Sequence, residues 1–392
     1  MVTMKRQGKS VEQKVVEKKG CWAKLSVLVL VFAMCVFFWY ADQQNAFDPI
    51  LVYPPRLPPL EKELAVNDRL TAATREFEGQ LVGPECVIVV KGSLYTGIVN
   101  GSILKINENG VKTFARFGPA GCSSMETCGR PLGLHYDEPR DRLFVVDACL
   151  GLFAIDMQTA KVTKIFPLNT AGVDPVKVTF FNALDMLPDG RIVMTESSQK
   201  FSLPNLIGDL LEGRPSGRVF LVDPSTGEWS VLAKDLYFAN GIQLHSDQQS
   251  VLVAETGMAR VLRIPLTNGT KHEVFADSLP GLPDNVNRSP RGGYWVSMAI
   301  ARSQGSPSLI DVLANWPTVR RFLYMIFPSK FLQYVGSLKK HAMIVRVDEN
   351  GKILESLHDT SGHMYNVADV CEKDGVLWLG SYRANFIGRL KI

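Results

Sequence analysis

The chain has 392 residues, of which 46% are hydrophobic and 21% are charged, and its formal net charge is only +4. This is the composition of a globular protein, and the lack of a basic patch interleaved with aromatic residues argues against a nucleic-acid partner. A soluble body of about 350 residues is too long for one simple sandwich, but it suits a single barrel or propeller, or two smaller domains.

The first feature along the chain is an uncharged apolar run at residues 25–41. Extended back to residue 21, it approaches the roughly 20 residues that a helix needs to cross a bilayer. Basic residues precede it and Asp42 follows it, so the positive-inside rule predicts a cytoplasmic tail at 1–20, a transmembrane signal-anchor at 21–41 and type II topology. A cleaved signal peptide is the alternative, but the run ends in bulky rather than small residues.

This topology predicts a body in the lumen of the endoplasmic reticulum or outside the plasma membrane, behind a Pro-rich linker at 42–72. Three glycosylation sequons would then be accessible, at Asn100, Asn268 and Asn287. The first two are also Asn-Gly pairs, so hairpin turns without a sugar are the alternative. Asn287 is the weakest sequon, because Pro290 follows it and a candidate metal site lies close by.

Past this linker, the sequence consists of short alternating or β-branched runs separated by turn signals, which is typical of β-strands. One unit recurs with a period of roughly 50 residues. It consists of a hydrophobic strand that contains Gly or Pro, a turn, and a strongly apolar strand. Repeats of this length, with about four strands each, are typical of propeller blades. The repeats start near Gly83, Pro131, Phe181, Phe238, Leu282 and Tyr365.

Six starts predict an all-β fold, a six-bladed β-propeller over residues 73–392. A pair of β-sandwiches is the alternative, although it leaves the period unexplained. The chain ends in a strand, so ring closure requires a strand within 73–82 to pair with the last blade. The long final gap contains a helical insertion at 308–336, expected as one or two helices. That insertion would form a lid, an amphipathic patch on the membrane, or a layer packed on the propeller.

Oxygen-bearing side chains occur in apolar settings at four of the repeat starts. They are Glu85, Asn182, Asn240, and Asp284 with its neighbour Asn285. The inner strands of a propeller converge on its axis, and two carboxylates with two or three carboxamides match the oxygen ligands that calcium prefers. Zinc or copper would prefer nitrogen or sulfur ligands. Each residue alone could be a turn former, but together they predict a shared calcium site.

Short motifs cover nearly the whole body. They are GPE at 83–85, CGRPLGL at 128–134, FNALD with a following DG within 181–190, FANGI at 238–242, GLPDN at 281–285 and LWLGSYR at 377–383. These motifs resemble the strictosidine synthase-like family, which belongs with paraoxonase, gluconolactonase and regucalcin among six-bladed propellers. The resemblance implies a catalytic calcium ion held by Glu85, Asn182, Asn240 and Asp284, with Asn285 as a further candidate.

The same resemblance implies a calcium-dependent hydrolase of the arylesterase type, acting on a small-molecule ester or lactone. Asp284 is the first candidate for its nucleophile or base, and Asp369 is the second. Asp369 also matches the glutamate with which plant strictosidine synthase condenses an amine and an aldehyde, but its side chain is shorter, so this reaction ranks last. A binding propeller with little or no turnover is the main alternative.

Cys122 and Cys128 lie six positions apart, a spacing that can close a small disulfide loop in an oxidising compartment. The family's cysteine pair falls on the same two positions, so the resemblance supports this disulfide. Cys86, Cys149 and Cys371 lie in strand-like segments and are expected to be buried thiols.

The histidine dyad of paraoxonases has no match, because Leu132 or Leu134 stands where its first histidine is expected. The nearby His135 is predicted to face solvent or to be hydrogen-bonded. His363 and Arg130 lie near repeat starts, and each is expected either to shape the mouth of the pocket or to have a structural role.

Overall fold

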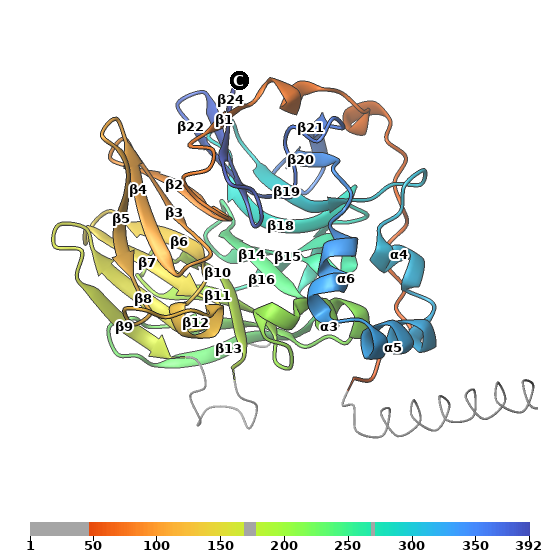
Figure 1. Cartoon of the computed structure of the whole chain (residues 1–392), viewed down its shortest axis with the longest axis horizontal. Helices are drawn as coiled ribbons and strands as arrows, with labels where there is room; N and C mark the ends of the chain where they lie inside the picture. Colours follow the sequence, from red (N-terminus) through yellow and green to blue (C-terminus); the bar gives the residue numbers. More distant parts are fainter. Residues whose placement is uncertain (1–46, 168–177, 268–270) are drawn as a thin grey trace, which may run out of the picture. The chain divides into compact units, whose positions relative to one another are not determined.

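Six four-stranded antiparallel sheets account for the strands in this computed structural model, which describes residues 47–167, 178–267 and 271–392 (Figure 1). The first three sheets are β2 (Val87–Val90), β3 (Ser93–Gly97), β4 (Ser102–Asn107) and β5 (Gly110–Arg116); β6 (Pro131–Asp137), β7 (Arg142–Asp147), β8 (Gly151–Asp156) and β9 (Val162–Pro167); and β10 (Phe180–Met186), β11 (Ile192–Ser198), β12 (Gly217–Val222) and β13 (Trp229–Leu236). The last three are β14 (Ala239–Leu244), β15 (Ser250–Glu255), β16 (Arg260–Pro265) and β17 (Glu273–Ala276); β18 (Gly281–Arg288), β19 (Tyr294–Ala301), β20 (Ala342–Val347) and β21 (Ile353–Asp359); and β22 (Val367–Lys373), β23 (Val376–Ser381), β24 (Ile387–Lys391) and β1 (Thr74–Glu76).

The sheets are the blades of a six-bladed β-propeller, as the repeat predicts. The first strands of successive blades, β2, β6, β10, β14, β18 and β22, lie next to one another, and β22 returns to β2 to complete a ring. The last sheet is closed by β1, whose Thr74 and Glu76 pair with Arg389 and Ile387 of β24. The predicted closing strand within 73–82 is therefore confirmed.

Apolar side chains from adjacent blades form the core between the sheets. One cluster joins Phe181 and Phe220 of the third blade to Phe166 of the second, with the Phe181 and Phe220 rings 5.6 Å apart and edge to face. Edge-to-face pairs of this kind add to the stabilisation from burial. Successive side chains of a strand point to opposite faces of its sheet, so each blade packs against the blade on either side.

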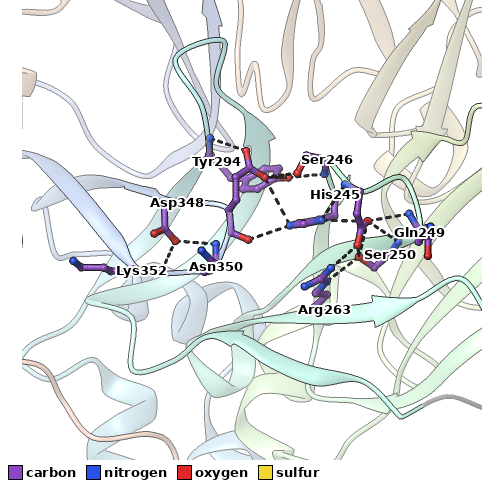
Figure 2. Close-up of polar contacts among 12 residues, drawn as sticks. His245, Ser246, Gln249, Ser250, Arg263, Tyr294, Asp348, Asn350 and Lys352 are labelled. Atoms are coloured by element: carbon purple, nitrogen blue, oxygen red, sulfur yellow. Dashed lines mark hydrogen bonds and ion pairs between the residues drawn. The ribbon is translucent and has the colours of Figure 1, made fainter.

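Polar contacts between turns also join the fourth and fifth blades (Figure 2). The Tyr294 hydroxyl accepts a hydrogen bond from the Ser246 amide at 2.8 Å and donates to Glu349 Oε2 at 2.9 Å. A ring nitrogen of His245, Nε2, lies 3.1 Å from the Glu349 carbonyl oxygen. Tyr294 is fully buried, so these bonds satisfy a hydroxyl that would otherwise be costly to bury.

The helical segments are η1 (Lys62–Leu64), η2 (Arg69–Ala72), α2 (Met125–Cys128), η3 (Leu203–Asn205), α3 (Leu206–Glu212), η4 (Thr256–Met258), α4 (Leu309–Leu313), α5 (Pro317–Ile326) and α6 (Ser329–Gly336). The insertion predicted as one or two helices thus contains three. Its first helix begins with a capping box between Ser308 and Asp311, which satisfies free N–H groups of the first turn. The sequence analysis did not predict α3.

The expected linker at 42–72 is packed against the propeller in its described part. The Ile50 amide donates to Glu212 O at 3.0 Å, and the Val52 amide donates to Ala314 O at 3.3 Å. Further along, the Asn67 side chain donates to Ser356 O at 3.0 Å. These contacts hold the segment that runs beside the helices and leads to β1, the strand that closes the ring.

The predicted cytoplasmic tail, the signal-anchor and the Asn268 sequon lie outside the described residues. Within the part of the chain that the structure describes, no helix combines the length and apolar character needed to cross a bilayer.

Candidate functional site

The predicted oxygen ligands lie at the starts of the innermost strands. Glu85 lies two residues before β2, whereas Asn182, Asn240 and Asp284 lie in the first half of β10, β14 and β18. All four side chains are buried, with exposed fractions of 4–5%. Because these strands are neighbours in the ring, the four residues are held at one end of the propeller axis.

The two carboxyl groups of this set influence each other electrostatically. Burial raises the pKa of Glu85 to about 7, against the opposing effect of Arg130 and with added repulsion from Asp369. Burial also raises the pKa of Asp284 well above its usual value; the negative charge of Glu85 raises it further, and a hydrogen bond with Asn240 lowers it. Like charges buried together disfavour ionisation of both groups, so a cation between them would stabilise the site.

The two asparagines are oriented by hydroxyl groups on the neighbouring strands. Asn182 Nδ2 donates to Ser197 Oγ at 3.0 Å, and Ser197 Oγ donates to Ala239 O at 2.8 Å. In the next blade, Asn240 Nδ2 donates to Thr256 Oγ1 at 3.1 Å, and that hydroxyl donates to Pro283 O at 2.7 Å. In each pair of hydrogen bonds, here termed a relay, the carboxamide nitrogen is held by a hydroxyl group, which fixes the orientation of the carboxamide. The hydroxyl group in turn donates to a backbone carbonyl of the inner strand in the following blade.

These hydrogen bonds occupy the carboxamide nitrogens of both asparagines and leave their carboxamide oxygens without a donor from the described residues. Within the described chain, Asn182 Oδ1 and Asn240 Oδ1 are buried and have no hydrogen-bond partner. A buried acceptor without a partner costs about 1–3 kcal/mol, and an oxygen-seeking cation would satisfy both. The described residues contain no group of three or more His, Cys, Asp or Glu side chains able to hold a metal ion, so such a site depends on the asparagines.

The residues that orient the asparagines were not predicted from the sequence. The second strand of two blades ends with the same device, a glutamate followed by a hydroxyl residue: Glu196-Ser197 and Glu255-Thr256. Glu196 accepts a hydrogen bond from the Thr179 amide at 2.7 Å, and Glu255 accepts one from the Tyr237 amide at 2.8 Å. The repeated Glu-Ser/Thr pair is therefore the sequence signal for the orienting residues.

Arg130 provides a positive charge beside Glu85. Its Nη2 lies 3.4 Å from Glu85 Oε2, and its Nη1 donates to Gly83 O at 2.7 Å. Arg130 is 3% exposed, so it is a buried partner of the site rather than a residue of the surface. It lies two residues after Cys128, whose disulfide with Cys122 confirms the predicted pairing.

Asp369 is held by two donors. The Val87 amide donates to its Oδ2 at 2.8 Å, and the Asn287 side chain donates to its Oδ1. Burial raises the pKa of Asp369 to about 6, against these hydrogen bonds. Asp284 is thus the stronger candidate for a reacting carboxylate. Asn285 follows Asp284 directly, and its backbone amide donates to Ser297 Oγ at 3.0 Å.

The other ends of the inner strands surround a cavity of about 250 Å³ on the axis. His135 lines it, and its Nδ1 lies 2.9 Å from Asp185 Oδ1, which confirms the expectation of a hydrogen-bonded histidine. Asn287 also lines this cavity, a placement that leaves little room for a glycan, whereas Asn100 is exposed in a turn before β4. The ring of His363 lies 2.9 Å from Ala73 O, beside the closing strand rather than at the mouth.

Comparison with known proteins agrees with this architecture. The strictosidine synthase family matches residues 182–268, and the strictosidine synthase-like N-terminal family matches residues 63–106. The adipocyte plasma membrane-associated protein of Rattus norvegicus is 36% identical over 336 residues, which cover 84% of this chain and 88% of the rat protein. This chain belongs to the strictosidine synthase-like family. The human adipocyte plasma membrane-associated protein is 34% identical over 333 residues, covering 83% and 79% of the two chains.

Solved structures similar to this member of the strictosidine synthase-like family share its fold. A gluconolactonase from Xanthomonas campestris has a TM-score of 0.54 at 16% identity and covers 88% of this chain and 97% of its own. A calcium-binding protein, regucalcin, from Agrobacterium tumefaciens has a TM-score of 0.51 at 13% identity, with coverages of 88% and 96%. At these identities, the likeness concerns the fold alone.

Proposed function

We propose that the chain is a membrane-anchored, calcium-dependent hydrolase of small esters or lactones. The observation that carries the proposal is the pair of buried, unpartnered oxygens, Asn182 Oδ1 and Asn240 Oδ1 among the described residues, beside the buried carboxyls of Glu85 and Asp284. Two solved structures with a similar fold, a gluconolactonase and a calcium-binding regucalcin, are consistent with such a site. Membrane association is supported by the apolar run at 25–41 and by the name of its plasma membrane-associated relatives.

Glu85, Asn182, Asn240 and Asp284 would hold the calcium ion, with Asn285 as a further ligand. Two carboxylates and the carboxamide oxygens form a hard-oxygen donor set of the kind calcium prefers. When bound, the ion would supply Lewis-acid polarisation of a substrate carbonyl and a positive charge beside the developing oxyanion.

The protein's own residues would orient the ligands and move the proton. Ser197 and Thr256 hold the two carboxamides in one orientation, and Arg130 holds Glu85. Asp284 would accept the proton of the attacking water as its oxygen bonds to the carbonyl carbon. The carboxyl group would then return that proton to the leaving oxygen as the ester bond breaks.

The amine–aldehyde condensation of strictosidine synthase is a weaker candidate. The carboxylate at the matching position, Asp369, already accepts hydrogen bonds on both oxygens. Its shorter side chain is therefore held within the ring instead of extending toward a substrate.

An arylesterase and lactonase assay of the full chain in detergent, with calcium or with a calcium chelator, tests the proposal. We expect hydrolysis that is lost with chelator, restored by calcium and abolished in D284N. Hydrolysis that is indifferent to calcium would contradict the mechanism. No turnover in either condition would favour a binding propeller.

A further inference from the structure

The three helices of the insertion present a surface of exposed apolar side chains, termed here the aromatic patch. Its residues, 36–61% exposed, are Val312, Trp316, Val319, Ile326, Phe327, Phe331, Tyr334 and Leu338. Val319 and Ile326 share one face of α5, and Phe331 and Tyr334 share one face of α6, since positions three, four or seven apart lie side by side on a helix. The Phe327 and Phe331 rings stack with centroids 5.1 Å apart, so the patch is continuous between the two helices.

The opposite faces of the same helices are fixed to the propeller. Arg320 of α5 is 2% exposed and donates to Leu211 O at 2.7 Å. Gln333 of α6 donates to Pro204 O at 2.8 Å. The outward orientation of the patch is therefore built into the fold and is not the result of an unpacked segment.

The charged residues within the stretch of chain that carries the patch have one sign. No Asp or Glu occurs at residues 312–347, whereas Lys330 and Lys340 are exposed within this stretch. The Arg383 guanidinium lies 5.5 Å from the centroid of the Tyr334 ring. Aromatic residues flanked by cations suit the boundary between lipid headgroups and acyl chains.

The position of the patch along the chain supports the same partner. Residues 50–55 lie against these helices: the Val52 amide donates to Ala314 O, and Arg302, which pairs with Asp311 of α4, donates from Nη2 to Pro55 O at 2.7 Å. If residues 21–41 cross the bilayer as the sequence predicts, chain length alone keeps Ile50 within about 30 Å of the membrane. Figure 1 shows the segment after residue 49, in orange-red, running beside α4 and α5.

We infer that the aromatic patch is a second membrane contact, which rests in the interface of the bilayer that holds the anchor. The helices also stand at the end of the ring where the candidate site lies, because Leu206 and Leu210 of α3 pack against Phe180 and Phe238, just ahead of Asn182 and Asn240. The contact therefore orients the site relative to the lipid surface.

The test is tryptophan quenching with the full chain reconstituted into phosphatidylcholine vesicles, with or without brominated acyl chains. Trp22 and Trp39 of the predicted anchor give a constant background, so the native chain is compared with W316F. We expect the quenched part of the emission to fall in W316F and to stay unchanged in the control W378F, whose tryptophan lies in β23. Equal quenching in the native chain and in W316F would overturn the inference.

A second variant tests the patch as a whole. F331S/L338S should reduce the quenching of Trp316 at least about twofold, whereas L354S, an equally conservative change at an exposed leucine of β21, should not. A change of oligomeric state in F331S/L338S without lipid quenching of Trp316 in the native chain would make the patch a contact between copies and overturn the inference. So would failure of the vesicles to retain the native chain.

Discussion

The side-chain amide of Asn240 donates to the Thr256 hydroxyl at 3.1 Å, and this one bond determines which atom of Asn240 faces the site. The Thr256 hydroxyl is itself fixed, because it donates to Pro283 O in the next blade. The carboxamide oxygen of Asn240 is left buried, and no described residue donates a hydrogen bond to it. The ligand orientation proposed for calcium is therefore imposed by the blade-to-blade packing.

Replacing Thr256 tests this relay. T256V keeps the shape of the side chain but removes the acceptor for Asn240 Nδ2, so we expect hydrolysis or calcium affinity to fall about 10–100-fold, as on loss of other groups that orient a metal ligand. T256S keeps the hydroxyl and should retain most of the native value. Native hydrolysis and calcium affinity in T256V would contradict this relay.

Calcium should stabilise the native fold and not a chain lacking a ligand. A ligand at 100 times its dissociation constant adds about 2.7 kcal/mol to the free energy of unfolding, so melting of the native chain should shift upward with calcium. N182A should lose this shift. In chelator N182A should lose only about 1 kcal/mol of stability, for the hydrogen bond from Asn182 Nδ2 to Ser197 Oγ, because Asn182 Oδ1 has no partner to lose within the described chain.

The raised pKa of Glu85 gives the stability in chelator a definite pH dependence. The folded pKa is about 7 and the usual value is 4.5, so between these values the folded state binds a proton that the unfolded state has released. Stability should therefore fall as pH rises from about 4.5 to about 7. Thermal melts of the native chain and of E85Q should converge at low pH and diverge above it, with E85Q more stable. Parallel curves would contradict a buried, unmetallated Glu85.

Arg130 should be costly to remove singly. R130M leaves Glu85 without its buried counter-charge, so we expect a loss of stability that grows as pH rises through about 7, where Glu85 becomes ionised. The double variant R130M/E85Q should recover part of that loss in chelator. The check is the free energy of unfolding from denaturant titration of both single variants and the double variant, where simple additivity would mean that the two side chains do not interact.

Loss of the Tyr294 hydroxyl should weaken the contact between the fourth and fifth blades. Y294F removes the partner of the Ser246 amide and of Glu349, for which we expect a cost of about 1–2 kcal/mol. Y53F, at a tyrosine that is 74% exposed, is the matched control and should be neutral. Activity should be unchanged in both, since these residues lie apart from the ligand set.

The sequence predicted the parts of the structure that repeat. The six starts near Gly83, Pro131, Phe181, Phe238, Leu282 and Tyr365 correspond to the beginnings of the six inner strands, because periodicity and turn chemistry are local signals. The motifs indicated the likeness to the strictosidine synthase-like family, which the comparisons confirm.

The missed features depend on contacts between distant segments. The seven residues of α3 lie within a loop of the third blade, and the helix ends at Gly213 in the left-handed conformation, a C-cap that the sequence could have indicated. The packing of residues 50–58 against α3 to α5 left no periodic pattern to find. The roles of Ser197 and Thr256 become visible only when two blades are placed side by side.

The proposed hydrolase requires that Glu85, Asn182, Asn240 and Asp284 share one cation. Calorimetric titration of calcium into the chelator-treated full chain measures this, with D284N and N240A titrated in parallel. We expect one saturable site in the native chain, lost in D284N and weakened in N240A. Binding of calcium with the same affinity in all three proteins, or no binding to the native chain, would contradict it.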